Sequence, residues 1–253
     1  MAKVSVIMSV FNSGTLLKEA VQSIQNQSLK DFEFLIVNDG STDETRESLK
    51  CFSEDDDRIQ IFDNKKNKGL AASLNMAWKQ ASGDFIARMD ADDISEPERL
   101  EKQYVFLKKK QDVCVLGTNA SLINRKNETI GKSIRRESHE SLVRHMPTEN
   151  PFFHSSVMMR KEFLLATGGY DEKFRRSQDY DLWSRGTSIG KYHNLQDCLL
   201  RYRVAEKISW STIYWGSYSK FCHAQRHGNT CLGYWYASRF IVGCLVAKLK
   251  LLS

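Results

Sequence analysis

Long apolar runs, paired cysteines and a secretory leader are all absent from this 253-residue sequence. No run of about 18 uncharged apolar residues occurs, which argues against a membrane-spanning helix. The N-terminus, MAKVSVIMSVFNSG, has one lysine and no small-residue cleavage site behind a long apolar core, so we expect no signal peptide. The six cysteines form no CxxC pair, which argues against a zinc site or redox dithiol and indicates reduced thiols in a cytosolic protein.

Four common motifs are missing as well. The sequence contains no GxxxxGK[ST] phosphate loop, no GxGxxG dinucleotide fingerprint, no HExxH and no GxSxG elbow. Any bound nucleotide must therefore be held in another way.

The composition that is present indicates a globular protein with a basic tail. A hydrophobic fraction of 41% in a chain of this length suffices for one large α/β domain, with or without an appendage. The net charge is +6, and from Tyr202 onward many lysines and arginines stand among aromatics, with Glu206 as the one acid. Such a tail can bind phosphates, nucleic acid or an anionic membrane, and composition alone does not distinguish these partners.

Strand-like and helix-like segments alternate along the first half. Buried-strand patterns are expected at 4–11, 32–39, 59–62 and 85–89. Helices are expected at 15–27, from a capping box at Ser41, after Gly69, and at 95–108. This order predicts a mostly parallel sheet flanked by helices. Further on we expect a strand at 113–123, a polar surface segment at 132–150, a strand leading into a helix at 151–161, a turn at 168–171, and helices at 177–186 and 211–253.

Polar residues follow several of the expected strands, and an acidic cluster follows the fourth. In open parallel sheets, ligands bind outside the carboxyl ends of the strands. Within FIARMDADDIS, Asp90, Asp92 and Asp93 stand together just beyond a strand, where Asp90 and Asp92 could face one divalent cation. The alternative is that Asp92 or Asp93 caps the following helix. Asp39 likewise either forms an Asx turn or accepts a hydrogen bond from a base or ribose.

An ordered set of segments resembles glycosyltransferase family 2, which has the GT-A fold. The matching segments run over roughly residues 3–210 and are SVIMSVFNSG, FEFLIVNDGSTDET, NKGLAASLN, GDFIARMDADDISEPERLEKQ, NPFFHSSVMMRK, GGYDEKFRRSQDYDLWSR and LLRYRV. A lone DxD is weak, whereas this set in this order is specific. The resemblance implies an α/β, Rossmann-like GT-A domain with a mostly parallel central sheet and a C-terminal helical appendage.

The resemblance also implies an activity and a site. The family's inverting members move a sugar from a nucleotide-activated donor, usually a UDP-sugar, to an acceptor hydroxyl. By position, the metal ligands for Mn²⁺ or Mg²⁺ would be Asp90 and Asp92, and the general base would be Asp179. The residues implied in donor binding are Phe11, Asn12, Asp39, Asn67 and Gly69, with Asp90 at the diphosphate. A divalent cation would neutralise the leaving diphosphate, and a carboxylate opposite would take the acceptor's proton.

The sequence departs from the family pattern at several positions. Gln178 replaces a common glutamate beside the proposed base, which leaves Asp181 as the runner-up on another helical face. Leu74 stands where many relatives carry arginine, and Arg88 could supply that charge. Ala205 replaces a frequent histidine, so a metal ligand from that segment is in doubt.

Three residues are candidates for contact with the acceptor or the transferred sugar: His154, Asp181 and Trp183. A lone histidine in an apolar strand is more often a satisfied core residue, and that alternative stays open for His154.

We expect a catalytic domain over residues 1–210, with a nucleotide-sugar half at 1–110 and an acceptor half at 111–210. The C-terminal segment 211–253 is expected to be helical, and within it 238–253 either packs on the domain or lies on an anionic leaflet. Surface-polysaccharide enzymes of this kind act at the cytoplasmic membrane face on lipid-diphosphate-linked saccharides, so we expect a cytoplasmic, peripheral protein with a glycan acceptor.

Three other functions are weighed against this one. A sugar-nucleotide pyrophosphorylase would need a glycine-rich N-terminal loop with a basic residue, which VFNSGT lacks. A non-catalytic nucleotide-sugar-binding protein would not need Asp90, Asp92 and Asp179 together. A nucleic-acid binder would explain the basic tail, but not the acidic strand end, so no nucleic-acid partner is expected.

Overall fold

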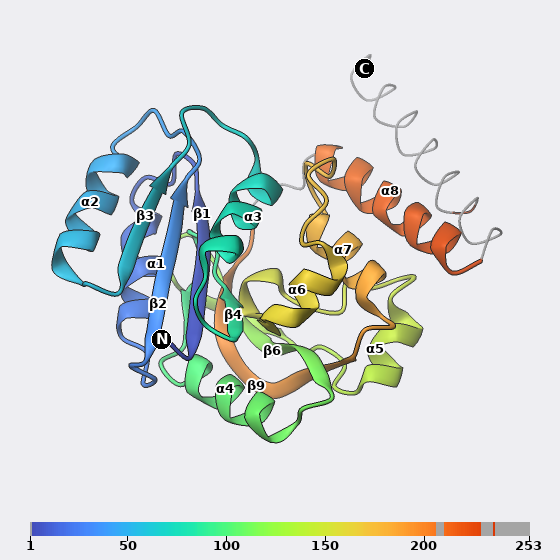
Figure 1. The fold of residues 1–253 in the computed structure, drawn as a ribbon. Helices are drawn as coiled ribbons and strands as arrows, with labels where there is room; N and C mark the ends of the chain where they lie inside the picture. The colour runs from blue at the N-terminus through green and yellow to red at the C-terminus, as the bar shows by residue number, and fades with distance from the viewer. Residues whose placement is uncertain (1, 206–209, 229–234, 236–253) are drawn as a thin grey trace, which may run out of the picture.

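A computed structural model describes residues 2–205, 210–228 and 235 of the chain (Figure 1). Its described residues form one sheet of nine strands, in the order β3-β2-β1-β4-β8-β6-β9-β5, with β7 paired to β6. The strands in chain order are β1 (Val4–Val10), β2 (Phe32–Asn38), β3 (Ile59–Asp63), β4 (Phe85–Arg88), β5 (Ile94–Ser95), β6 (Val113–Ile123), β7 (Thr129–Ser133), β8 (Met158–Arg160) and β9 (Lys191–Arg203).

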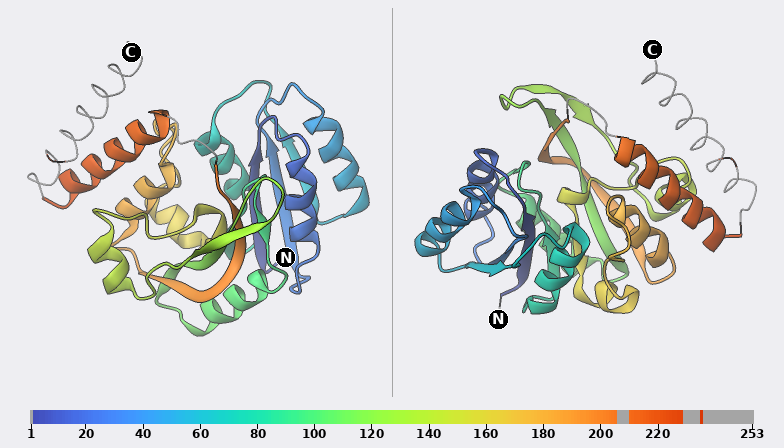
Figure 2. Two further views of the ribbon diagram at one scale, coloured as in Figure 1. Left: turned by 180° about the vertical axis from the view of Figure 1, so that it is seen from behind. Right: turned by 90° about the horizontal axis from the view of Figure 1, so that it is seen from above.

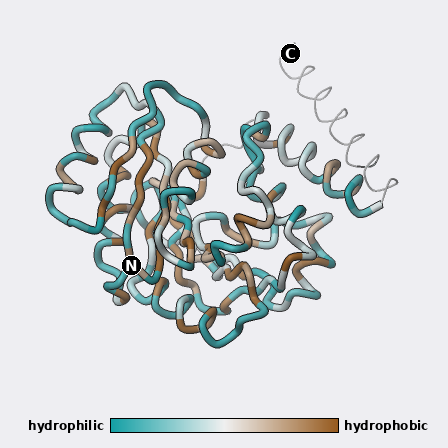
Figure 3. Tube along the Cα trace, in the orientation of Figure 1, coloured by the Kyte–Doolittle hydropathy of each residue, from teal (hydrophilic) through white to brown (hydrophobic). Residues whose placement is uncertain are grey.

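The N-terminal half of the sheet is parallel. The pairs β3–β2, β2–β1 and β1–β4 all run in the same direction. Helices α1 (Leu16–Gln25) and α2 (Thr45–Asp55) contribute to one apolar cluster, and α3 (Leu70–Gln80) contributes to a second on the other face. Because both faces are covered, β1 and β2 read as nearly continuous apolar runs (Figure 3).

The C-terminal half is mixed in direction. Strand β8 runs antiparallel to β4 and β6, and β9 runs parallel to β6. This half curls away from the parallel strands, and α6 and α7 lie over it (Figure 2). Its helices are α4 (Arg99–Lys109), α5 (His139–His145), the 3₁₀ turn η1 (His154–Ser156), α6 (Lys161–Thr167), α7 (Gln178–Gly186) and α8 (Trp210–Arg226). The fold is therefore α/β with a GT-A arrangement.

The structure confirms the expected strands at 4–11, 32–39, 59–62, 85–89 and 113–123 to within one residue at each end. It also confirms the helices at 177–186 and, over the described residues, at 211–226. The rest of the expected helical segment, including the tail 238–253, lies outside the described residues. Among the described residues, no helix combines the length and apolar character needed to cross a bilayer.

Two expected helix starts are wrong. Helix α2 begins at Thr45 and is not capped by Ser41, because the Ser41 hydroxyl accepts a hydrogen bond from the Asn12 amide instead. Ser95 belongs to strand β5, and α4 begins at Arg99. In both places the serine that the local pattern predicts as a helix cap instead accepts a hydrogen bond from a distant residue, Asn12 for Ser41 and Gln27 for Ser95.

Two further expectations from the second half were incomplete. The polar segment 132–150 ends a strand and contains α5, and the long strand β9 was recognised only as the LLRYRV motif near its end. Strand β9 has an irregular pattern of burial, since its register with β6 shifts at three places. Such a strand lacks the clean alternation that sequence analysis needs.

Candidate functional site

The loops after β1 and β2 are joined at the carboxyl edge of the parallel strands. Asn12 has a left-handed backbone (φ 49°), and its amide donates to Ser41 Oγ at 3.1 Å while its Oδ1 accepts from the Thr42 amide at 2.9 Å. Phe11 beside it is 48% exposed, so its ring is accessible to a ligand at this edge. The two residues predicted to line the base are thus presented on a fixed loop.

Asp39 holds the loop that leads into α3. Its carboxylate is 2% exposed, and Oδ1 accepts from Asn64 Nδ2 at 2.8 Å and from the Lys68 amide at 2.9 Å. Its Oδ2 accepts from the Gly69 amide at 2.9 Å, and Gly69 has a φ of 96° that favours glycine. The Asx-turn alternative is wrong for Asp39, because Asn38 Oδ1 accepts the turn hydrogen bond from the Ser41 amide. A contact of Asp39 with a nucleotide base stays a prediction.

Close backbone packing brings the predicted second nucleotide loop to the same edge. A Cβ on Gly40 would lie 2.6 Å from the carbonyl carbon of Lys66 and 2.7 Å from the Asn67 nitrogen. Glycine is therefore required there, and Asn67 lies exposed beside the end of β2.

The three aspartates after β4 have different environments. Asp90 is partly buried, and its Oδ1 pairs with Arg88 Nη2 at 2.5 Å. Asp92 lies toward the surface, yet desolvation of its carboxyl and the charge of Asp90 raise its pKa to about 6. The part of this shift that comes from the Asp90 charge is a cost that a bound cation would remove.

Asp93 points inward and connects distant segments. It is 2% exposed, and its carboxylate accepts from the Arg203 amide at 2.7 Å and from the Ser155 hydroxyl. Burial and the charges of Asp90 and Asp92 raise its pKa to about 8. The capping alternative is wrong for Asp92 and Asp93, since α4 begins six residues beyond Asp93, at Arg99, without a side-chain cap.

The acidic edge suits a hard divalent cation that keeps other ligands. Among the residues that the structure describes, no group of three or more His, Cys, Asp or Glu side chains forms a metal site. Asp90 and Asp92 offer two carboxylates, which matches Mg²⁺ or Mn²⁺ bound by one or two carboxylates together with water and substrate phosphates. The donor set therefore fits the predicted ion, provided the substrate completes the coordination.

Arg88 lies beneath the acidic cluster. Its side chain is fully buried, and Nε and Nη1 have no hydrogen-bond partner among the described residues. Leu74, where many relatives carry arginine, is buried in the apolar cluster on the α3 face. The charge of Arg88 reaches the site through Asp90; direct contact with the donor stays a prediction.

His154 is part of a small aromatic cluster. Its Nε2 lies 2.9 Å from the Tyr170 hydroxyl, and its ring makes edge contacts with Tyr170 and Trp183 at 5.5 Å and 6.2 Å between centroids. Burial and the nearby Arg88 charge hold the pKa of His154 well below its ordinary value, so the imidazole is neutral. Trp183 is fully buried against Phe152, and its ring supports His154, while its contact with an acceptor stays a prediction.

Asp179 lies in the first turn of α7 and faces the acidic cluster. Its Oδ2 accepts a hydrogen bond from Asn150 Nδ2 at 2.7 Å. Burial raises the pKa of Asp179, and the negative charge of Asp90 adds to the shift. The predicted base and a predicted metal ligand, which are 89 positions apart in the sequence, therefore lie close enough to interact.

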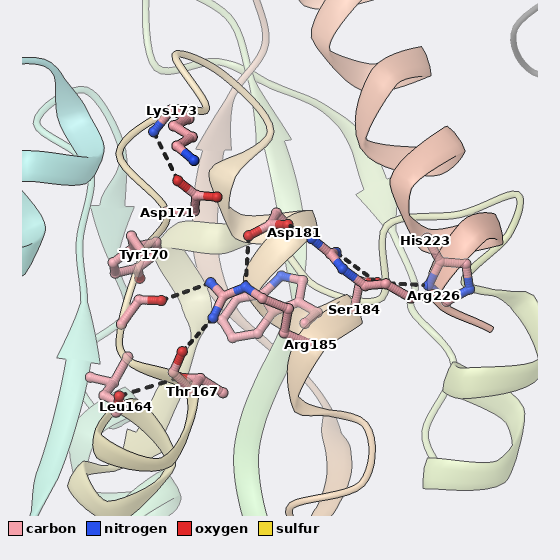
Figure 4. Close-up of polar contacts among 12 residues, drawn as sticks. Leu164, Thr167, Tyr170, Asp171, Lys173, Asp181, Ser184, Arg185, His223 and Arg226 are labelled. Carbon is pink, nitrogen blue, oxygen red and sulfur yellow. Dashed lines mark hydrogen bonds and ion pairs between the residues drawn. The ribbon is translucent and has the colours of Figure 1, made fainter.

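Asp181 points to a different face of α7. It is fully buried and forms ion pairs with Arg185 Nε at 2.9 Å and Arg226 Nη2 at 2.7 Å (Figure 4). Arg185 in turn donates to the Thr167 and Gly169 carbonyl oxygens. Both oxygens of this carboxylate are used in ion pairs that hold α7 against α8 and against the turn after α6. The structure therefore does not support Asp181 as an alternative base or as a contact with the acceptor.

Three features of the site are not predictable from the local sequence: the contacts of Asn150 and Tyr170 and the anchoring role of Asp93. Asn150 and Tyr170 stand inside two of the segments that carried the resemblance, NPFF and GGYDEKF, which was the available signal. Their partners Asp179 and His154 lie 29 and 16 positions away in the sequence, and local pattern contains no information on such pairs.

Comparison with known proteins agrees with this geometry. A family model described as glycosyl transferase family 2 matches residues 5–168. EpsE of Bacillus subtilis, named as a glycosyltransferase, is 40% identical over 205 residues, covering 79% of this chain and 73% of EpsE. The O-antigen biosynthesis glycosyltransferase WbnJ of Escherichia coli is 36% identical over 208 residues, covering 81% of this chain and 80% of WbnJ.

Two solved structures share the fold at low sequence identity. TarS 1–349 of S. aureus, in complex with UDP-GlcNAc, is 19% identical with a TM-score of 0.73, covering 94% of this chain and 71% of that one. The mannosyltransferase PcManGT of Pyrobaculum calidifontis, in complex with GDP-Man and Mn²⁺, is 16% identical with a TM-score of 0.71, covering 98% and 75%. By its matched segments, its fold and its acidic sheet edge, the chain belongs to glycosyl transferase family 2.

Proposed function

We propose that this glycosyltransferase moves a sugar from a nucleotide-sugar donor, a UDP-sugar, to a saccharide hydroxyl with inversion at the anomeric carbon. The observation that carries the proposal is the position of Asp179 in the first turn of α7, where Asn150 holds its carboxylate at 2.7 Å and where burial, with a smaller contribution from the charge of Asp90, raises its pKa. A base on one side and a cation-binding edge on the other leave the reacting sugar between them. That arrangement suits a single displacement.

The donor half rests on the joined loops at the carboxyl edge. Phe11 and Asn12 line the base, and Asp39 holds Asn67 and Gly69 in place through the loop before α3. Asp90 and Asp92 would hold Mn²⁺ or Mg²⁺, which supplies positive charge to the diphosphate as it leaves. Arg88 keeps the Asp90 carboxylate oriented toward that edge.

The acceptor half supplies the proton transfer. The acceptor hydroxyl loses its proton to the Asp179 carboxylate as its oxygen bonds to the anomeric carbon and the bond to the diphosphate oxygen breaks. Burial makes Asp179 a stronger base than an exposed aspartate, and Asn150 orients it. His154 and Tyr170 would line the sugar beneath, with His154 neutral.

The relatives support a setting in surface-polysaccharide assembly. WbnJ is named for O-antigen biosynthesis, and the two structural neighbours are complexes with UDP-GlcNAc and with GDP-Man and Mn²⁺. We propose a lipid-diphosphate-linked saccharide as acceptor, used at the cytoplasmic face of a membrane. Residues 1–110 would form the donor half and 111–210 the acceptor half.

A nucleotide-sugar panel tests the proposal. The protein is incubated with Mn²⁺, each of several UDP- and GDP-sugars, and a lipid-diphosphate saccharide, and the products are read by mass spectrometry. We expect a mass increase of one sugar with one donor, lost in Asp92→Ala and in Asp179→Asn. If neither UDP nor any other nucleotide, tested with Mn²⁺, changes the melting temperature of the wild type, the donor assignment is wrong.

A further inference from the structure

Helix α8 carries an aromatic surface that the proposed reaction has not yet used. Phe174, Trp215 and Tyr218, here called the aromatic triad, pack with ring centroids 5.5 to 5.9 Å apart. Tyr218 is 42% exposed and Trp215 is partly exposed, while Phe174 is buried beneath them. None of the three belongs to the two apolar clusters of the sheet, so core packing does not explain the triad.

Side chains on an adjacent stripe of α8 hold the helix against α7. His223 Nδ1 lies 2.9 Å from the Ser184 hydroxyl, and Arg226 pairs with Asp181 (Figure 4). Ser219 on the same face is buried. These contacts fix α8 against α7 and so fix the position of Trp215 and Tyr218 on the adjoining stripe.

The triad adjoins the proposed base. Phe174 lies in the loop that leads directly into α7, and Asp179 is five residues beyond it. A Cβ on Gly216 of α8 would lie 4.0 Å from the hydroxyl of Ser177, the residue just before α7. Helix α8 therefore passes next to the first turn of α7, which carries Asp179.

The triad also has a carboxylate beside it. Asp171 lies in the same loop as Phe174, and its Oδ1 accepts from the Lys173 amide at 3.0 Å (Figure 4). The Phe174 amide donates to the Asp171 carbonyl oxygen at 3.1 Å, so Asp171 stands in the same turn as the Phe174 ring of the triad.

From this juxtaposition we infer that the triad and Asp171 form a binding site for a neutral sugar ring of the acceptor, an inference that rests on the proposed function. The C–H bonds on one face of a pyranose carry partial positive charge and are attracted to the negative face of an aromatic ring. A carboxylate beside the rings accepts hydrogen bonds from sugar hydroxyls. Packed aromatic rings with a hydrogen-bond acceptor beside them, next to the helix that carries the proposed base, fit a saccharide ring of the acceptor.

The test measures saccharide binding directly by saturation-transfer NMR on the full chain. The probes are methyl glycosides and disaccharides of glucose, galactose and N-acetylglucosamine. We expect the wild type to bind at least one of them, Tyr218→Ala to bind about tenfold more weakly, and Tyr218→Phe to bind within about twofold of the wild type. Leu165→Ala, a change at an exposed position of α6, serves as the control and should leave binding unchanged.

Two results would overturn the inference: wild-type saccharide affinity in Tyr218→Ala, or no binding of any probe by the wild type. Sedimentation with phosphatidylglycerol vesicles identifies the competing occupant, since loss of vesicle binding in Tyr218→Ala without any saccharide binding would make this a membrane contact. Stabilisation by UDP and Mn²⁺ is measured in every variant and should not change. If Tyr218→Ala loses saccharide binding but is still stabilised by UDP and Mn²⁺, the inference is supported. If UDP and Mn²⁺ do not stabilise the wild type, the proposed donor is wrong instead.

Discussion

Asn150 donates a hydrogen bond of 2.7 Å to the carboxylate of Asp179, and the charge of Asp90 contributes to the raised pKa of that carboxyl. An amide donor of this kind favours the charged carboxylate, whereas burial and Asp90 disfavour it. The net effect is a raised pKa, so the carboxylate is held in one orientation and is more basic than in water.

Removing the base should separate binding from chemistry. Asp179→Asn keeps the side-chain volume, so we expect stabilisation by UDP and Mn²⁺ to stay as in the wild type while transfer falls by at least about a hundredfold. Isothermal titration and product mass spectrometry measure the two properties. Near-wild-type turnover would show that another group takes the proton.

Asn150→Ala tests the orientation of the base. The variant leaves Asp179 charged but without its amide partner, and we expect kcat to fall about tenfold with little change in the KM for the donor. It should also raise the pKa of Asp179, because the hydrogen bond that favours the charged form is lost. A pH–rate profile of Asn150→Ala whose acidic limb lies at the same pH as in the wild type would contradict this role.

The affinity for a divalent cation should depend on pH through Asp92. Its pKa is raised to about 6, and a carboxylate must be deprotonated to bind a cation. Lowering the pH through 6 therefore weakens the binding of UDP with Mn²⁺, by about tenfold at pH 5 relative to pH 7.5. Calorimetric titration at the two pH values measures the ratio, and a constant affinity would exclude Asp92 as a ligand.

Asp39→Ala should destabilise the loop before α3, which is proposed to bind the donor. The change leaves the amides of Lys68 and Gly69 and the side chain of Asn64 without their buried acceptor. We expect a loss of about 2–3 kcal/mol of unfolding free energy, together with a loss of binding to UDP. Glu44→Ala, at the nearby start of α2, is the control, since Glu44 makes no side-chain cap there. Chemical denaturation measures the difference.

Asp181→Asn should weaken the junction of α7 and α8 without touching the chemistry directly. It breaks two ion pairs of a fully buried carboxylate, and we expect a loss of about 3 kcal/mol. Asp112→Asn breaks an ion pair whose side chains are both 56% exposed, and should leave the unfolding free energy almost unchanged. Equal losses in thermal unfolding would mean that the Asp181 pairs contribute no more than a surface pair.

The parallel half of the fold was predictable because its strands are buried on both faces and its helices repeat at a helical period. Val4–Val10 and Phe32–Asn38 are short apolar runs with polar residues at their ends, and this pattern gave the sheet edge where the donor site lies. The family resemblance then supplied Asp90, Asp92 and Asp179.

The remaining site residues depend on contacts between distant segments. Asp181 and Asp179 stand in the same helical turn, and nothing in QDYDLW shows that Asp181 is paired with Arg226, 45 positions away. Trp183 was expected near the acceptor, yet Phe152 and Phe163 enclose it. Helical spacing gives the face on which a side chain lies, whereas the element that covers that face is decided by tertiary packing.

The anchoring of Asp93 has a consequence for the order of folding. Its two hydrogen bonds reach partners 62 and 110 positions further along the chain. The acidic loop can therefore reach its final shape only after the polypeptide has been made as far as β9 and that strand has paired. During synthesis, the parallel strands would pair before the acidic loop could bind a cation. The ability to bind the donor would therefore arise late in folding.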